Sequence, residues 1–146
     1  MTEAVLDASI VLAWFGRERQ AKAGEALRWR QLFQDGRLSV FAPPLLLLEI
    51  MNVAGRKWGW TAVALNQLAA ELEESGFELQ EPELASVATW VGRGLTAYDA
   101  AYVALADTLK IPLVTADRLI LETAPAIALP VGHELPEARQ IPPVDE

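Results

Sequence analysis

The sequence predicts an α/β protein, a three-layer α/β/α sandwich with a central, mainly parallel sheet of four to five strands. Two observations favour this fold. Short apolar runs alternate with segments of helical periodicity, and this alternation is typical of parallel sheets covered by helices on both faces. The 146 residues are 52% hydrophobic, which is enough for the core of one domain. We expect that domain over residues 1–130 and an irregular tail rich in proline and charge over 131–146.

The predicted elements follow one another in a regular order. Strands are expected at short apolar runs bounded by polar or turn residues, and helices where apolar residues recur at helical spacing. Ser9 is expected to cap the first helix. The strands are expected over residues 4–6, 38–42, 77–79, 111–114 and 126–129, and the helices over 10–15, 20–35, 45–54, 61–75, 82–91, 96–109 and 118–123.

Glu49 stands out because it follows four consecutive leucines in a helix that is expected to be apolar on all sides and therefore buried. A carboxylate in such a helix must be paired, protonated or bound to a metal ion, unless it reaches the surface at a polar edge. Asn52 lies three positions later on the same face, where it either orients Glu49 or faces a ligand.

Three aspartates are expected at one edge of the sheet. Asp7 and Asp117 each follow a predicted strand, and Asp99 lies near the start of a helix with Tyr98 and Tyr102 on its core side. Thr96 and Asp99 have the spacing of a capping box, so Asp99 either only caps the helix or also directs an oxygen into a cleft. Because the carboxyl ends of parallel strands meet at one edge, we expect the aspartates to converge there, with Glu49 reaching the same place.

Four carboxylates in one cleft repel one another unless protons or cations are bound. Ligands that are all oxygen favour hard cations, Mg²⁺ or Mn²⁺. The chain has no cysteine, and its single histidine, His133, lies in the proline-rich segment, so a zinc site is not expected. A cation held by carboxylates suits hydrolysis of a phosphodiester by an activated water.

The net charge of −8 does not exclude a nucleic-acid substrate. Residues 71–83 carry −6 and residues 134–146 carry −3, which leaves +1 for the rest of the chain. The segment 56–60 is predicted as a basic and aromatic loop that either packs against helix ends or contacts RNA. Individual basic side chains are either solvated or contact phosphate; the candidates for RNA contact are Arg17, Arg56, Lys57 and Arg118.

At these positions the chain resembles a PIN-domain ribonuclease, and within that group a VapC-type toxin of a type II toxin–antitoxin system. Each motif by itself is weak, but the four occur in family order over about residues 3–130. The matching segments are 5–9 (Val-Leu-Asp-Ala-Ser), 43–49 with Asn52 after it, 98–106 (Tyr-Asp-Ala-Ala-Tyr-Val-Ala-Leu-Ala) and 113–117 (Leu-Val-Thr-Ala-Asp).

The resemblance implies an endoribonuclease that depends on Mg²⁺ or Mn²⁺. It implies that the ion is held by four carboxylates, Asp7, Glu49, Asp99 and Asp117, with hydroxyl support from Ser9 and Thr115. It also implies a homodimer and inhibition by a small cognate antitoxin. The lack of cysteine fits a reducing compartment, and the N-terminus lacks the pattern of a signal peptide, so we expect a cytoplasmic protein.

Two other functions are compatible with parts of the sequence. The first is a protein-binding module of this fold with weak or no catalysis, which would bind a partner helix on the apolar run 10–15 and the loop with Trp58 and Trp60. The second is a phosphatase or receiver-like domain with an aspartyl nucleophile. It is disfavoured because Ser9 stands where a second aspartate is needed and no lysine follows the strand at 111–114.

Overall fold

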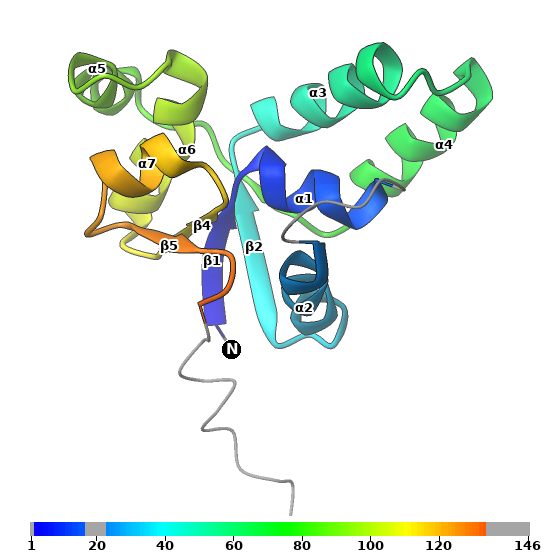
Figure 1. Ribbon diagram of the computed structural model, residues 1–146, viewed down its shortest axis with the longest axis horizontal. Helices are drawn as coiled ribbons and strands as arrows, with labels where there is room; N and C mark the ends of the chain where they lie inside the picture. The colour runs from blue at the N-terminus through cyan, green and yellow to red at the C-terminus, as the bar shows by residue number, and fades with distance from the viewer. Residues whose placement is uncertain (1, 17–22, 134–146) are drawn as a thin grey trace, which may run out of the picture.

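The computed structural model describes residues 2–16 and 23–133, which form a layered α/β structure (Figure 1). All neighbouring strands pair in parallel, in the order β3-β2-β1-β4-β5. This confirms the predicted α/β fold with a central parallel sheet. The strands are β1 (Thr2–Leu6), β2 (Leu38–Ala42), β3 (Glu78–Leu79), β4 (Leu113–Thr115) and β5 (Ala128–Pro130).

Helices lie to both sides of β1 and β2, with α2 on one side and α6 on the other (Figure 1). The order of strands and helices along the chain is the predicted one. In the ranges described, no helix is long and apolar enough to cross a membrane. The helices are α1 (Ala8–Phe15), α2 (Ala23–Gln34), α3 (Leu45–Asn52), the π-helical turn η1 (Val53–Lys57), α4 (Ala62–Glu73), α5 (Leu84–Gly92), α6 (Ala97–Leu109) and α7 (Arg118–Thr123).

The core is organised around β1 and α6. β1 is the middle strand, and Val5 pairs with Phe41 on one neighbouring strand and with Leu113 on the other. A strand covered on both faces reads as a continuous apolar run, and Val5 and Leu6 have no exposed surface. In α6 every residue from Ala100 to Ala106 is buried, so this helix lies inside the molecule.

The helix that carries Glu49 is not buried on all sides, and the prediction that it is was wrong. Leu46 and Ile50 face the core, whereas Leu48 is 70% exposed. The prediction of a loop over 56–60 was wrong for residues 56 and 57, because the helix continues from α3 through η1 to Lys57. Four consecutive leucines carry no periodicity, so the sequence could not say which side of the helix faces solvent.

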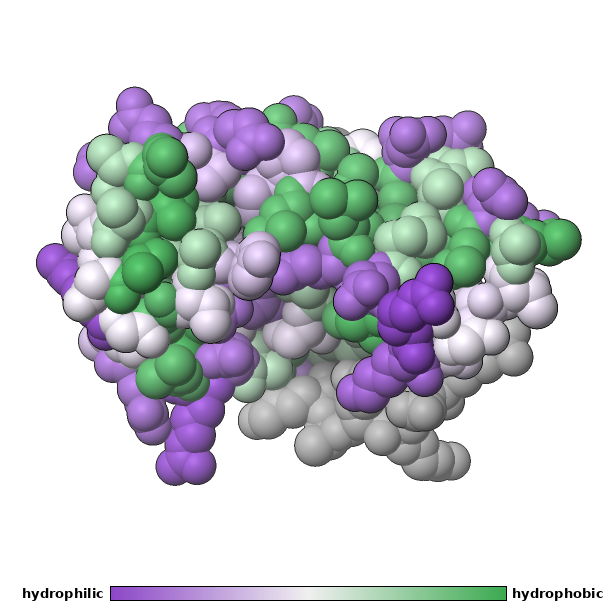
Figure 2. Space-filling model, turned by 90° about the horizontal axis from the view of Figure 1, so that it is seen from above, coloured by the Kyte–Doolittle hydropathy of each residue, from purple (hydrophilic) through white to green (hydrophobic). Residues whose placement is uncertain are grey.

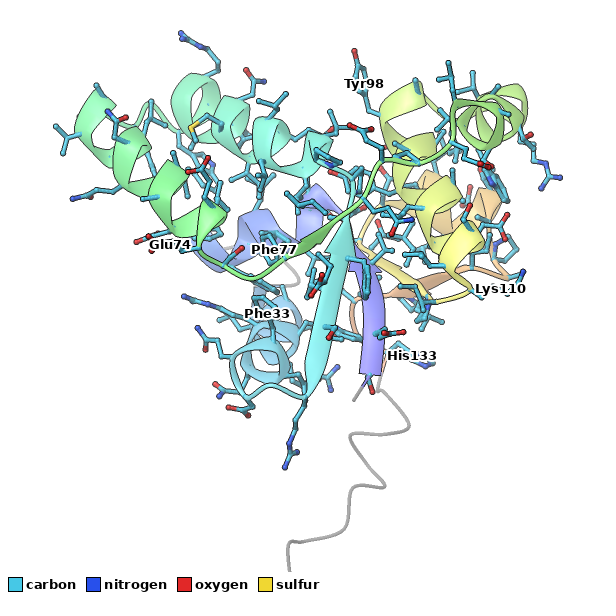
Figure 3. The ribbon with its side chains drawn as sticks, turned by 180° about the vertical axis from the view of Figure 1, so that it is seen from behind. Phe33, Glu74, Phe77, Tyr98, Lys110 and His133 are labelled. Atoms are coloured by element: carbon cyan, nitrogen blue, oxygen red, sulfur yellow. The ribbon has the colours of Figure 1, made fainter. Side chains whose placement is uncertain are left out.

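Side chains of the apolar run 10–15 pack into the core. Ile10, Val11 and Trp14 are buried, which contradicts its prediction as a docking surface. The ring of Trp14 contacts the rings of Phe33 and Phe77. Phe33 and Phe77 stack on each other with ring centroids 5.3 Å apart and lie side by side in Figure 3. This aromatic cluster joins α1, α2 and the segment before β3.

Candidate active site

Asp7 leaves the end of β1 and caps α1. Its carboxylate accepts hydrogen bonds from the backbone N–H of Ser9 at 3.1 Å, from the Ser9 hydroxyl at 2.5 Å and from the hydroxyl of Thr115. Asp7, and not Ser9 as predicted, is therefore the N-cap, and Ser9 is the second residue of the helix. Burial raises the pKa of Asp7 to about 6, although the hydrogen bonds from Ser9 and Thr115 act in the opposite direction.

Thr115 connects Asp7 to the next acid. It is the last residue of β4 and is fully buried, and its hydroxyl accepts a hydrogen bond from the backbone N–H of Asp117 at 2.9 Å. Asp117 in turn caps α7 by accepting from the backbone N–H of Ile120 at 2.9 Å. The ends of β1 and β4 are thus held together by side chains, which places Asp7 and Asp117 at the same edge of the sheet.

Glu49 reaches this region from α3. Its carboxylate accepts a hydrogen bond from the hydroxyl of Tyr102, a residue that lies on α6, 53 positions away in the sequence. Glu49 is partly buried, and its pKa is raised first by that burial and then by the negative charge of Asp99, while the bond from Tyr102 lowers it. A carboxylate that is both desolvated and beside another acid is poorly compensated by the protein itself.

Asp99 is at the start of α6. Its backbone N–H donates to the Thr96 hydroxyl at 3.1 Å, which makes Thr96 the N-cap of α6 and confirms that part of the predicted capping box. The pKa of Asp99 is raised first by burial and then by the negative charge of Asp117, and is lowered by a hydrogen bond with Thr96. Asp99 therefore interacts electrostatically with Glu49 and with Asp117.

The four acids belong to one region. The pKa of Tyr102 is raised first by burial, then by its hydrogen bond to Glu49, and then by the negative charges of Glu49, Asp7 and Asp99. Seen toward the carboxyl ends of the strands, hydrophilic side chains gather in the middle of the face, between apolar groups on either side (Figure 2). The convergence expected from the sequence is supported by these interactions.

The donor set fits a hard divalent cation. It consists of carboxylate oxygens, and three of the four carboxyl groups, those of Asp7, Glu49 and Asp99, have raised pKa values that a cation would lower. Within the described residues, no three acidic or histidine side chains already form a metal-binding group. Binding would therefore require these side chains to turn inward or to contact the ion through waters, as Mg²⁺ often does.

Tyr102 is the functional candidate that sequence reasoning missed. It was assigned to the core only, together with Tyr98. The ring of Tyr102 is indeed 2% exposed, but its hydroxyl meets Glu49. Tyr98 is 62% exposed and projects from the start of α6, so its prediction as a core residue was wrong (Figure 3). The signal for Tyr102 was its position one helical turn after Asp99.

For the remaining candidates in the described part of the chain, no hydrogen bond or ion pair to the four acids is seen. Asn52 is exposed at the end of α3, and Arg56 and Lys57 are exposed in η1. Arg118 is 91% exposed in its side chain and forms an ion pair with Glu122 at 3.2 Å. Arg17 lies outside the described residues. These positions leave RNA contact by the basic residues as a prediction.

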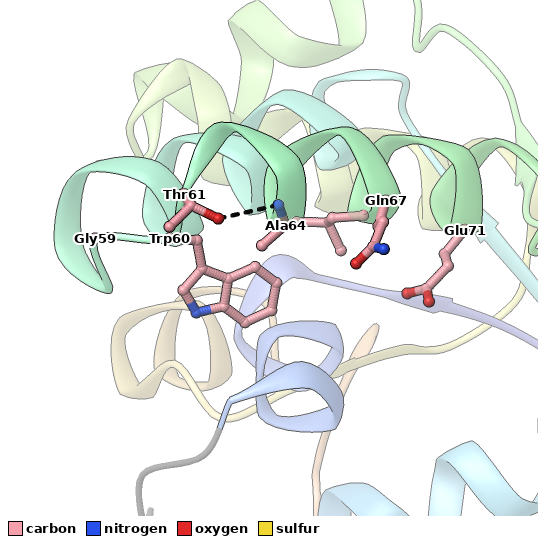
Figure 4. A pocket seen from close by; sticks show the side chains of 7 residues that line it. Gly59, Trp60, Thr61, Ala64, Gln67 and Glu71 are labelled. Carbon is pink, nitrogen blue, oxygen red and sulfur yellow. Dashed lines mark hydrogen bonds between the residues drawn. The ribbon is translucent and has the colours of Figure 1, made fainter.

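A separate pocket of about 430 Å³ lies beside α4 (Figure 4). Trp60 and Leu68 line it with the polar side chains of Thr61, Gln67 and Glu71, and none of the four clustered acids takes part. Trp60 also contacts Trp58, with ring centroids 5.6 Å apart, and both rings pack against the core. The sequence left open whether these tryptophans pack against the protein or contact RNA, and the structure shows them packed.

Comparisons with known proteins identify the family and the fold. The sequence profile of the PIN domain family matches residues 4–125, whereas a comparison with curated protein sequences gives no match. The fold is similar to the crystal structure of PAE2754 from Pyrobaculum aerophilum, with 26% identity, a TM-score of 0.63, and coverage of 89% of this chain and 91% of that one.

Two further solved structures have the same fold at lower identity. FitAcB from Neisseria gonorrhoeae is 18% identical, with a TM-score of 0.64 and coverage of 90% of this chain and 99% of that one. VapC20 from Mycobacterium tuberculosis, described as a toxin that cleaves the sarcin-ricin loop, is 17% identical, with a TM-score of 0.62 and coverage of 84% and 94%.

Proposed function

Because the chain belongs to the PIN domain family, we propose that it is a metal-dependent endoribonuclease and the toxin of a toxin–antitoxin pair. The observation that carries the proposal is the electrostatic influence of the four acids on one another and on Tyr102. Asp99 interacts with Glu49 and with Asp117. Tyr102 is affected by Asp7 as well as by Glu49 and Asp99. Burial raises the pKa values of Asp7, Glu49 and Asp99. The charge of a neighbouring acid raises those of Glu49 and Asp99 further, as expected of a group that a divalent cation would stabilise.

In this proposal Asp7, Glu49, Asp99 and Asp117 hold Mg²⁺ or Mn²⁺, which when bound acidifies a water and stabilises the charge that develops on the phosphodiester. The chain's own contribution is to hold the ligands in place. The hydroxyls of Ser9 and Thr115 fix the orientation of Asp7, and Thr115 also holds the turn that leads to Asp117. No side chain is required as a nucleophile, because water attacks the phosphorus.

The substrate in this proposal is RNA, with phosphate contacts from Arg56, Lys57 and Arg118, which are exposed. Arg17 belongs to the same proposal but lies outside the described residues. We assign the nuclease to residues 1–130 and place the protein in the cytoplasm, where an RNA substrate is available.

The partners in this proposal are a second copy of the chain and a small antitoxin. Support for a protein partner comes from exposed apolar side chains, notably Leu84 at 82% and Val91 at 42% on one side of α5. Apolar groups also gather on that side of the molecule in Figure 2. One solved structure of the same fold is of FitAB bound to a DNA fragment, at 17% identity over 90% of this chain and 97% of that one, with a TM-score of 0.63.

The test is an RNA cleavage assay with the purified protein and its Asp99→Asn variant. We expect cleavage that requires Mg²⁺ or Mn²⁺, stops with EDTA, and falls at least about a hundredfold in the variant, because losing one metal ligand weakens both the ion and its orientation. Asp107→Asn is the matched control, since Asp107 is an exposed acid on the same helix and should leave the rate unchanged.

A protein-binding module of this fold with weak or no catalysis is the alternative function. It predicts no metal-dependent cleavage by the wild type, or equal background rates for the wild type and Asp99→Asn. Either result would reject the nuclease.

A further inference from the structure

Tyr102 combines a buried ring with a hydroxyl at the candidate site. The ring is 2% exposed and lies among the buried residues of α6, where a phenylalanine would fill nearly the same space. A hydroxyl in such surroundings costs free energy unless it finds a hydrogen-bond partner. It finds Glu49 on α3, so its polar atom is satisfied by a candidate metal ligand rather than by the helix backbone.

Among the described residues Glu49 has one hydrogen-bond donor, whereas Asp7 has several. Asp7 accepts hydrogen bonds from both Ser9 and Thr115, and Asp117 is fixed by capping α7. For Glu49, Tyr102 is the one hydrogen-bond donor among the described residues. The glutamate side chain is long and rotatable, and it begins on a helix whose next-door residue, Leu48, faces solvent.

We propose that Tyr102 is a positioning residue for the metal site: its hydroxyl holds one oxygen of Glu49 and thereby turns the carboxylate toward the other three acids. This inference rests on the proposed function, since it gives Tyr102 a role through the ion that Glu49 would bind. The contact engages Oε1 and leaves Oε2 free for a cation. It also connects α3 to α6, the helix that carries Asp99. Outer residues that orient ligands in this way are a general requirement of metal sites.

The experiment measures the dissociation constant of Mn²⁺ from the electron paramagnetic resonance signal of free Mn²⁺, with no RNA present. Tyr102→Phe removes only the hydroxyl, and we expect it to weaken Mn²⁺ binding about tenfold. Tyr98→Phe is the matched control, because it makes the same chemical change one turn earlier on α6 at a residue that is 62% exposed. It should bind Mn²⁺ like the wild type. Thermal unfolding without metal verifies that both variants are folded.

A double-mutant cycle with Glu49→Gln separates positioning from packing. If the hydroxyl acts through the Glu49 carboxylate, adding Tyr102→Phe to Glu49→Gln should change the dissociation constant by less than about twofold. An equal loss in both backgrounds would mean that the hydroxyl acts elsewhere and would overturn the inference. So would wild-type affinity in Tyr102→Phe. A wild-type protein that binds no Mn²⁺ contradicts the proposed function itself, and the inference then fails with it.

Discussion

Replacing Asp7 by asparagine tests whether this buried carboxylate destabilises the metal-free protein. Burial raises the pKa of Asp7 from its ordinary 3.8 to about 6. The folded protein therefore keeps the proton at pH values where the unfolded chain has lost it, and stability falls as the pH rises through this interval. At 1.36 kcal/mol for each pH unit, the full effect is about 3 kcal/mol, present above about pH 6 and mostly absent near pH 4.

Asp7→Asn removes this penalty but also replaces the charged oxygen that accepts from Thr115, a loss of about 1 kcal/mol that does not depend on pH. We therefore expect the variant to be more stable than the wild type by about 2 kcal/mol near pH 7, with the advantage shrinking or reversing toward pH 4. The difference between the two pH values is the diagnostic quantity.

The assay is urea unfolding followed by tryptophan fluorescence, in EDTA, at several pH values between about 4 and 7. Asp107→Asn serves as the control, because it removes an exposed carboxylate. The reasoning is refuted if the free-energy difference between Asp7→Asn and the wild type is the same at both ends of the pH range, or if it grows as the pH falls.

Two further substitutions test other parts of the structure. Thr115→Val keeps the shape of a fully buried side chain but removes two hydrogen bonds, the one that the hydroxyl donates to Asp7 and the one that it accepts from the N–H of Asp117. We expect urea unfolding to show a loss of about 2–3 kcal/mol in the free energy of unfolding. A loss below about 0.5 kcal/mol would contradict these hydrogen bonds. Lys110 ends α6 with a φ of 58°, a left-handed conformation that glycine adopts without steric cost. We therefore expect Lys110→Gly to raise the melting temperature, with a gain of about 1 kcal/mol in the free energy of unfolding. Lys110→Ala should not raise it, because alanine keeps the Cβ atom.

The order of elements could be predicted from the sequence because each strand is a short apolar run with polar or turn residues on both sides. The strand predicted over 4–6 is the end of β1, and the helix predicted over 118–123 is α7. The exact first residue of a helix was harder to predict than the presence of the helix. Asp7 and Ser9 are both capping types two positions apart, and only the backbone path decides between them.

The candidate acids and the hydroxyls of Ser9 and Thr115 could be named from the sequence, whereas the contact of Tyr102 could not. Asp7, Asp99 and Asp117 follow from a general rule about the edges of parallel sheets. The contact between Tyr102 and Glu49 follows from no local pattern, since it depends on how α3 and α6 approach each other. The exposure of Leu48 was missed for the same reason, because packing between helices decides which side of α3 is covered.

The hydroxyl of Thr115 and the carboxylate of Asp7 are 108 positions apart in the sequence, and this has a consequence for how the protein is made. A ribosome releases the N-terminal part first. Asp7 and Glu49 therefore emerge before β4, which lies directly beside β1 in the sheet. A chain that has not yet reached β4 lacks one of the two partner strands of β1 and also lacks Asp117, one of the four acids. For the nuclease proposed above, this strand order would delay activity until β4 and the turn after it have been made.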